Sequence, residues 1–344
     1  MKNKRILKLV GSACMVVVLT LTLVLPISCT PQEGGEYEIG IFQIVINPAL
    51  DAAREGFKDA LTAAVLAKGG NVTYNEQEAA GEPSNAATIA ESFVADGVDL
   101  ICAINMSCAQ AAALAVNETD IPVVFNSVTN PVVAGIVDSW DVPGGQVTGV
   151  SDIAPVDPQL QLIVDIFEDE ANNLTFETLG VIYNPSEDNS VYQVDVQLPE
   201  AIELLSLNIS VVKEPASNPT EVLAAAEALV GQVDAIWIPT DNTVVASIAA
   251  VIGVAEDNDI PLFASDTSII EEGVIGCWGM DYYTVGYASG EMAALILLMG
   301  ADPATMPVQT LPASLLYVYP EEAERMGVTI PQWLIDMADV VVED

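Results

Sequence analysis

The chain has 344 residues, enough for two domains of ordinary size, with 49 acidic residues, 9 basic residues and no histidine. A formal net charge of −40 repels nucleic-acid phosphates, so we expect no nucleic-acid partner. The lack of histidine removes the commonest metal ligand and general base, and we expect no metal site and no cofactor.

The first 28 residues predict a secretory signal peptide. Residues 1–8 carry four basic side chains and no acid, and residues 11–25 form an uncharged apolar run that is short for a membrane span. The run ends in an imperfect match to a bacterial lipobox, which predicts lipidation of Cys29. Residues 29–37 then read as a flexible tether. We expect an extracytoplasmic, lipid-anchored protein; the alternative is an ordinary signal peptide, with Cys29 incidental.

Strand-length apolar runs alternate with helical patterns along the rest of the chain, which predicts βαβ units and parallel sheets. The strands are nearly continuous in their apolar residues, as is typical of sheets covered on both faces. In the first half we expect strands at 38–46, 71–76, 99–104 and 123–125, with helices at 49–68, 85–96 and 108–117. In the second half we expect strands at 178–183, 209–213, 235–238 and 262–264, with helices at 191–207, 221–230 and 244–257.

The two halves repeat the same order of short motifs. The spacing is also close, since 52 residues separate Asn47 from Asp99 and 50 separate Asn184 from Asp234. The repeat predicts an α/β protein with two Rossmann-like lobes that hold a small molecule between them. The motifs are Asn47-Pro48, Val98-Asp99 and Ile121-Pro122, followed by Asn184-Pro185, Val233-Asp234 and Ile260-Pro261.

The segments between and after the halves predict three passages between the lobes, which together form a three-segment hinge. The first passage is expected at 147–158 and the second at 279–286, ahead of a helix at 285–299 and a late strand at 315–319. Lobe 1 is then expected to comprise residues 38–150 and 284–316, and lobe 2 residues 151–283 and 317–344.

Ligands of open parallel sheets bind beyond the carboxyl ends of the strands, and here those ends are rich in Asn, Ser, Thr and Asp. The same residue types cap helices, which is the structural alternative for each of them. Hydroxyls and helix N-termini can hold an α-carboxylate, whereas Asp241 and Asp266 can pair with an α-ammonium group. The pattern favours a zwitterionic ligand; a sugar or nucleoside is the alternative within the same fold.

The motifs at these ends resemble those of the tryptophan/phenylalanine-type substrate-binding lipoproteins of ABC importers, over nearly the whole chain after the signal. The resemblance implies a type I periplasmic-binding-protein fold, capture of an aromatic or other apolar amino acid, and delivery to a permease with its ATPase. The motifs that carry it are Asn47–Phe57, Ile121–Phe125, Pro143–Asp152, Tyr183–Ser190, Pro239–Asn242 and Asp281–Gly286.

The resemblance also implies a set of ligand contacts. Phe42, Tyr282 and Tyr283 are candidates for packing against the ligand's ring, and a place in the strand core is the alternative for Phe42. Residues 105–110 and Asn130 depart from the family's usual sequence, which leaves the substrate open. The remaining candidates are Ser107, Cys108, Ser127 and Thr129 in lobe 1 and Asn189, Ser190, Asp241, Asn242 and Asp266 in lobe 2.

Two other classes of protein are alternatives. A secreted hydrolase without histidine would depend on a Ser/Lys pair or on paired carboxylates. The ligand-sensing core of a transcription repressor would need a DNA-binding segment, which the signal-like N-terminus does not provide. We therefore expect a monomeric binding protein that is not an enzyme.

Overall fold

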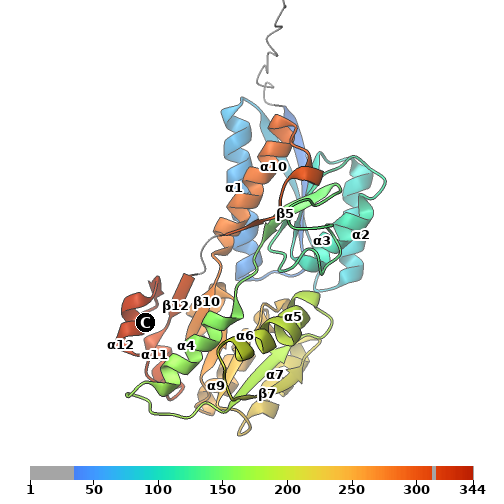
Figure 1. Ribbon diagram of the computed structural model, residues 1–344. Coiled ribbons are helices and arrows are strands. Elements are labelled where there is room, and N and C mark those ends of the chain that lie inside the picture. The colour runs from blue at the N-terminus through green and yellow to red at the C-terminus, as the bar shows by residue number, and fades with distance from the viewer. Residues whose placement is uncertain (1–34, 312–314, 344) are drawn as a thin grey trace, which may run out of the picture. The chain divides into compact units, whose positions relative to one another are not determined.

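The computed structural model describes residues 35–311 and 315–343. The predicted signal peptide, the lipidation site at Cys29 and most of the expected tether lie outside these residues. The described chain forms two separate sheets of mostly parallel strands with helices packed on them, as Figure 1 shows, so the predicted α/β class is confirmed.

The first sheet has six strands in the order β11-β5-β4-β3-β1-β2, and every pair in it is parallel. Helices α1 and α10 lie side by side, and α2 packs with α3 (Figure 1). The elements are β1 (Glu36–Gln43), α1 (Pro48–Ala67), β2 (Asn71–Glu78), α2 (Pro83–Asp96), β3 (Leu100–Ile104), α3 (Met106–Ala115), β4 (Val123–Asn126), β5 (Val147–Ser151), α10 (Tyr282–Met299), η3 (Pro303–Thr305) and β11 (Gln309–Thr310).

The second sheet has seven strands in the order β13-β12-β10-β9-β8-β6-β7, and only the β10–β12 pair is antiparallel. Its strands are β6 (Thr178–Tyr183), β7 (Ser210–Pro215), β8 (Ala235–Ile238), β9 (Leu262–Ala264), β10 (Gly276–Gly279), β12 (Leu315–Val318) and β13 (Val340–Val341). Its helical segments are α4 (Val156–Glu168), α5 (Asp188–Tyr192), η1 (Gln193–Gln197), α6 (Leu198–Leu204), α7 (Pro219–Leu229), α8 (Asn242–Val245), α9 (Ile248–Asp257), η2 (Thr267–Glu272), α11 (Pro320–Arg325) and α12 (Gln332–Met337).

Both sheets contain the same strand order, which confirms the repeat seen in the sequence. The run β2-β1-β3-β4-β5 of the first sheet matches β7-β6-β8-β9-β10 of the second. In each case the order reverses between the first and third strands of the repeat. Ligand sites of such sheets lie at this reversal, beyond the carboxyl ends of the strands. The fold therefore positions Asn47, Asn105 and Asp241, which follow these strands, around one candidate site.

The structure differs from the sequence expectation where strands are short. Residues 147–151 were expected in a passage between lobes, but they form β5 and pair with β4 and β11. Leu315 and Leu316, expected in lobe 1, pair with Gly279 and Trp278 of the second sheet. β5 has five residues with Gly149 at its centre, which leaves too little apolar periodicity to be recognised from sequence. The strand at 315–319 was predicted, but its pairing with β10 depends on a partner distant in the chain, which the sequence pattern does not reveal.

Helix α10 begins at Tyr282, within the segment expected to cross between lobes. Asp281 caps it, because its Oδ1 accepts the Thr284 N–H at 2.6 Å. The helix then packs on α1 so closely that a Cβ built on Gly286 would overlap the Ala53 carbonyl. A glycine is needed at this crossing, and the contact fixes where α10 delivers Tyr282.

Candidate functional site

A small cavity lies at the carboxyl ends of strands from both sheets. Its free volume, about 10 Å³, is roughly what one water molecule needs, so a larger ligand requires the cavity to open. Segments associated with the first sheet contribute Asn47, Ala49, Leu50, Asn105, Met106, Ser127, Thr129, Asp152 and Tyr282. Segments of the second sheet contribute Asn189, Thr240, Asp241, Asn242, Val245 and Asp266.

Seven of the residues singled out in the sequence line this cavity. They come from different strand ends and helix starts, so the common order of the two sheets brings them together. These residues are Ser127, Thr129, Asn189, Asp241, Asn242, Asp266 and Tyr282.

The structure places the other candidates elsewhere. Tyr283 is exposed, and its hydroxyl donates to Asp59 at 2.9 Å. Phe42 is fully buried, with its ring edge-on to Phe93 at 5.7 Å between centroids, so it lies in the strand core. Ser107 lines a separate groove, and Ser190 is fully buried and donates to Asp241. Cys108 is also fully buried, and burial raises the pKa of its thiol.

Asp241 holds two strand ends of the second sheet together. Its Oδ1 accepts the Val244 N–H at 2.8 Å and caps α8, while its Oδ2 accepts the Asn184 N–H and the Ser190 hydroxyl, both at 2.6 Å. Burial and the neighbouring Glu187 carboxylate raise the pKa of Asp241 to about 7. Both carboxylate oxygens are therefore engaged by the protein itself.

Glu187, which sequence reasoning did not select, supports Asp241 from the adjacent loop. Its carboxylate accepts the backbone N–H groups of Asn242 and Thr243, both at 3.0 Å, and both of their side chains also donate to it. The carboxylates of Glu187 and Asp241 thus accept the first three backbone N–H groups of α8, those of Asn242, Thr243 and Val244.

Asp152 is a cavity residue that sequence reasoning missed. It follows β5, and its Oδ1 accepts the Thr129 hydroxyl at 3.1 Å, whereas its Oδ2 lies 3.5 Å from the Tyr282 hydroxyl. Burial raises the pKa of Asp152 to about 6, and the charge of Asp266 adds to this effect. Asp152 ends the motif Pro143–Asp152, but it was overlooked because β5 was taken for a passage between lobes.

Asp266 follows β9 and faces the cavity with one oxygen uncommitted. Its Oδ1 accepts the backbone N–H and the hydroxyl of Ser268, at 2.8 and 2.7 Å, and its Oδ2 accepts none from the described residues. Burial raises the pKa of this carboxyl. Burial, together with Asp266 and Asp152, also raises the pKa of Tyr282 well above its ordinary value.

Asn105 is another cavity residue that was not among the candidates selected from the sequence. Its φ of +82° is unusual for a residue other than Gly, and its Oδ1 caps α3 by accepting the Cys108 N–H at 3.0 Å. Its Nδ2 is buried and has no hydrogen-bond partner among the described residues. The departure of residues 105–110 from the family's usual sequence was the available signal.

The charge of the cavity is one-sided. Asp152, Asp241 and Asp266 line it, and none of the lining residues within the described ranges is basic. In those same ranges no group of His, Cys, Asp and Glu is arranged to hold a metal ion, and no helix is long and apolar enough to cross a membrane. The arrangement can hold a small molecule that carries a cationic group.

Comparison with known sequences identifies one family. Residues 38–342 match the family described as ABC transporter substrate binding protein. A relative named tyrosine-binding protein, from Clostridioides difficile (strain R20291), is 39% identical over 273 residues, which are 79% of this chain and 76% of the relative.

Solved structures agree. A conserved domain protein from Vibrio cholerae is 33% identical, with a TM-score of 0.81 over 89% of this chain and 99% of the other. An ABC domain from Streptococcus pneumoniae in complex with L-Trp is 30% identical, with a TM-score of 0.80 over 89% and 100%. A ligand-free, open substrate binding protein with adhesive properties from Clostridium difficile is 36% identical, with a TM-score of 0.66 over 89% and 99%. The chain therefore belongs to the ABC transporter substrate-binding protein family and has its type I periplasmic-binding-protein fold.

Proposed function

We propose that this protein captures an aromatic amino acid outside the cytoplasm and delivers it to an ABC permease powered by its ATPase. The main support for this proposal is a cavity lined by three buried aspartates, with no basic residue among its described lining side chains. An α-ammonium group satisfies that excess of negative charge, because a buried charge needs a partner. The relatives named for tyrosine and crystallised with L-Trp support the aromatic class.

The apolar part of the cavity supports an apolar side chain on the ligand. Leu50, Met106 and Val245 line it, each less than 5% exposed, and Tyr282 adds an aromatic ring. A sugar would leave these side chains without apolar partners. Structures with bound myo-inositol, allitol or 5-methylthioribose are only 14–16% identical to this chain and share its fold.

The protein performs no reaction on its ligand in this proposal, and closure of two lobes around a hinge would accomplish capture. We propose that it works as a monomer, secreted through the signal peptide at 1–28 and anchored by lipidated Cys29 and the tether at 29–37. Two measurements distinguish lipid anchoring at Cys29 from an ordinary signal peptide. Cleavage of the signal peptide should be sensitive to globomycin. Label from a fatty acid analogue should appear on the wild-type protein and be lost in Cys29→Ser.

Binding can be tested by thermal denaturation of the purified mature protein with amino acids, sugars and nucleosides. Tyrosine, tryptophan or phenylalanine should stabilise it, by about 2.7 kcal/mol when the ligand is a hundredfold above its Kd. Calorimetric titration should then give one site per chain. Stabilisation by sugars or nucleosides alone would overturn the amino-acid proposal.

A further inference from the structure

We infer that the cavity holds the amino acid in one orientation, with its α-carboxylate at Asn105 and its α-ammonium between Asp152 and Asp266. Asp241, the other acid of the cavity, is assigned a structural role. The inference rests on the proposed function and specifies which atoms recognise the two charged groups.

The carboxylate position follows from an unpaired donor. Asn105 is only 4% exposed. The Cys108 N–H donates to one atom of its side-chain amide, which must therefore be the oxygen Oδ1. The other atom is then the nitrogen Nδ2, and it has no acceptor among the described residues. The backbone N–H of Asn105 donates to the Asn126 carbonyl at 2.9 Å, which helps to hold its unusual backbone conformation. A buried donor without a partner is costly, and a ligand carboxylate removes that cost.

Helix α3 reinforces the same position. It starts at Met106, directly after Asn105, and runs for ten residues. Its N-terminus carries a partial positive charge that attracts anions. Since no basic side chain lies among the described residues of the cavity wall, this helix start and the Asn105 amide are the natural partners for a negative group.

The ammonium position follows from the acceptors that remain available. Asp266 has an Oδ2 that accepts no hydrogen bond from the described chain, and the Oδ2 of Asp152 has only the long contact with Tyr282. The two carboxylates come from the ends of β9 and β5, so one belongs to each sheet. A cation placed between them would offset their mutual repulsion.

Asp241 offers no comparable acceptor. Its two oxygens already take three hydrogen bonds of 2.6 to 2.8 Å from Asn184, Ser190 and Val244. An ammonium group could bind there only by competing with these bonds. The sequence suggested Asp241 and Asp266 equally for this role, and the hydrogen bonds separate them.

The carboxylate contact is tested with Asn105→Asp, which keeps the Oδ1 cap and replaces the donor by a negative oxygen. The affinity for L-tyrosine should fall at least about 30-fold, while tyramine, which lacks the carboxylate, should lose far less. If this variant does not fold, Asn105→Gly suits the positive φ and removes the donor without adding charge. It should lower the affinity for tyrosine about tenfold and leave that for tyramine unchanged.

The ammonium contact is tested with Asp152→Asn and Asp266→Asn, against Asp241→Asn as the matched control. Each of the first two variants should lower the affinity for L-tyrosine at least about 30-fold more than the affinity for 3-(4-hydroxyphenyl)propionate, which lacks the ammonium group. Asp241→Asn should lower the melting temperature and change the ratio of the two affinities far less than either of the other variants, because the oxygens of Asp241 are bound by Asn184, Ser190 and Val244. Calorimetric titration measures all of these ratios.

The outcomes separate the two proposals. A wild-type protein that binds no aromatic amino acid would overturn the proposed function. A wild type that binds tyrosine would overturn the orientation alone in either of two cases: unchanged ratios in the Asn105, Asp152 and Asp266 variants, or a change in Asp241→Asn as large as that in Asp152→Asn and Asp266→Asn.

Discussion

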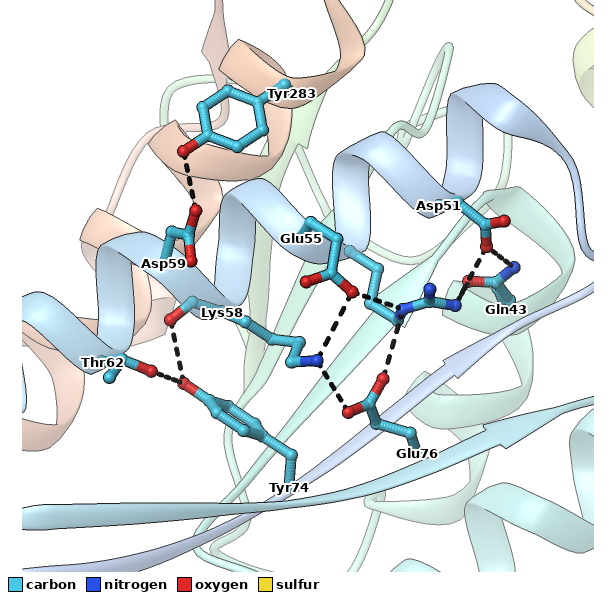
Figure 2. Close-up of polar contacts among 10 residues, drawn as sticks. Gln43, Asp51, Glu55, Lys58, Asp59, Thr62, Tyr74, Glu76 and Tyr283 are labelled. Carbon is cyan, nitrogen blue, oxygen red and sulfur yellow. Dashed lines mark hydrogen bonds and ion pairs between the residues drawn. The ribbon is translucent and has the colours of Figure 1, made fainter.

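Two acidic regions of this protein are built in opposite ways. On the surface of α1 and β2, shown in Figure 2, acids are interleaved with basic side chains. Arg54 lies 3.0 to 3.4 Å from Asp51, Glu55 and Glu76, and Lys58 lies 2.9 Å from Glu76. In the cavity, three aspartates are buried and no basic residue lines the described wall.

The contrast matters because basic residues are scarce. After the predicted signal peptide the sequence holds only Arg54, Lys58, Lys68, Lys213 and Arg325. Two of these five, Arg54 and Lys58, tie α1 to Glu76 of the edge strand β2, where partly exposed ion pairs contribute about 0–1 kcal/mol each. None serves the cavity, where burial instead raises the pKa of Asp152 to about 6 and that of Asp241 to about 7. The cavity's uncompensated charge is thus left for a ligand to neutralise.

The largest effect should come from giving the cavity its own cation. Met106 is 2% exposed and lines the cavity beside Asn105, and Met106→Lys adds an ammonium group on a side chain of similar length. Because that group competes for the aspartates, the affinity for L-tyrosine should fall more than about a hundredfold. Calorimetric titration measures the loss.

Met106→Leu is the matched control and should retain affinity within about tenfold, since it keeps the apolar wall. Wild-type affinity in Met106→Lys would mean that the cavity acids do not recognise a cation.

The second prediction concerns pH. The folded-state pKa of Asp152 lies above its ordinary value of 3.8, so the unliganded protein takes up a proton on folding between about pH 4 and 6. Its stability should therefore rise as pH falls through this window, with Asp152 contributing about 3 kcal/mol. The affinity for tyrosine should instead fall as pH drops below about 6, because a protonated carboxyl pairs poorly with an ammonium group.

Urea denaturation and calorimetric titration at pH 4, 5, 6 and 7 measure the two trends. Asp152→Asn should reduce the rise in stability towards low pH, and part of the rise should remain because the pKa values of Asp241 and Asp266 are also raised. Affinity for tyrosine that is constant from pH 7 to 4 would argue against ionised cavity acids as its partners.

The smallest effect should come from breaking the surface network. Glu76→Gln removes the acid that bridges Arg54 and Lys58, and should lower the free energy of unfolding by about 1 kcal/mol or less. The loss should shrink at high salt, since exposed ion pairs are screened. Tyrosine affinity should not change.

Glu91→Gln, at an exposed position of α2, is the control for removing one negative charge. If Glu76→Gln weakened ligand binding while the control did not, the two acidic regions would be coupled rather than separate.

The sequence by itself determined the α/β class, the repeat and the polar strand ends. Each depends on local order: alternating apolar runs specify βαβ units, and the recurrence of Asn47-Pro48 as Asn184-Pro185 marks the same place in both halves. Thr129 and Asp266 could therefore be selected for the cavity, because carboxyl ends of parallel strands share one edge.

Only the tertiary structure decided which of these groups are free to meet a ligand. Phe42 belongs to a strand buried on both faces, and its apolar pattern does not say which face the ring packs on. One of the hydrogen bonds that occupy the Asp241 carboxylate comes from Asn184, which is 57 residues away in the chain. Asp152 lines the cavity only because the short strand β5, which it follows, joins the first sheet. Hydrogen-bond saturation depends on such distant partners, so the residue types marked the site and the fold decided their roles.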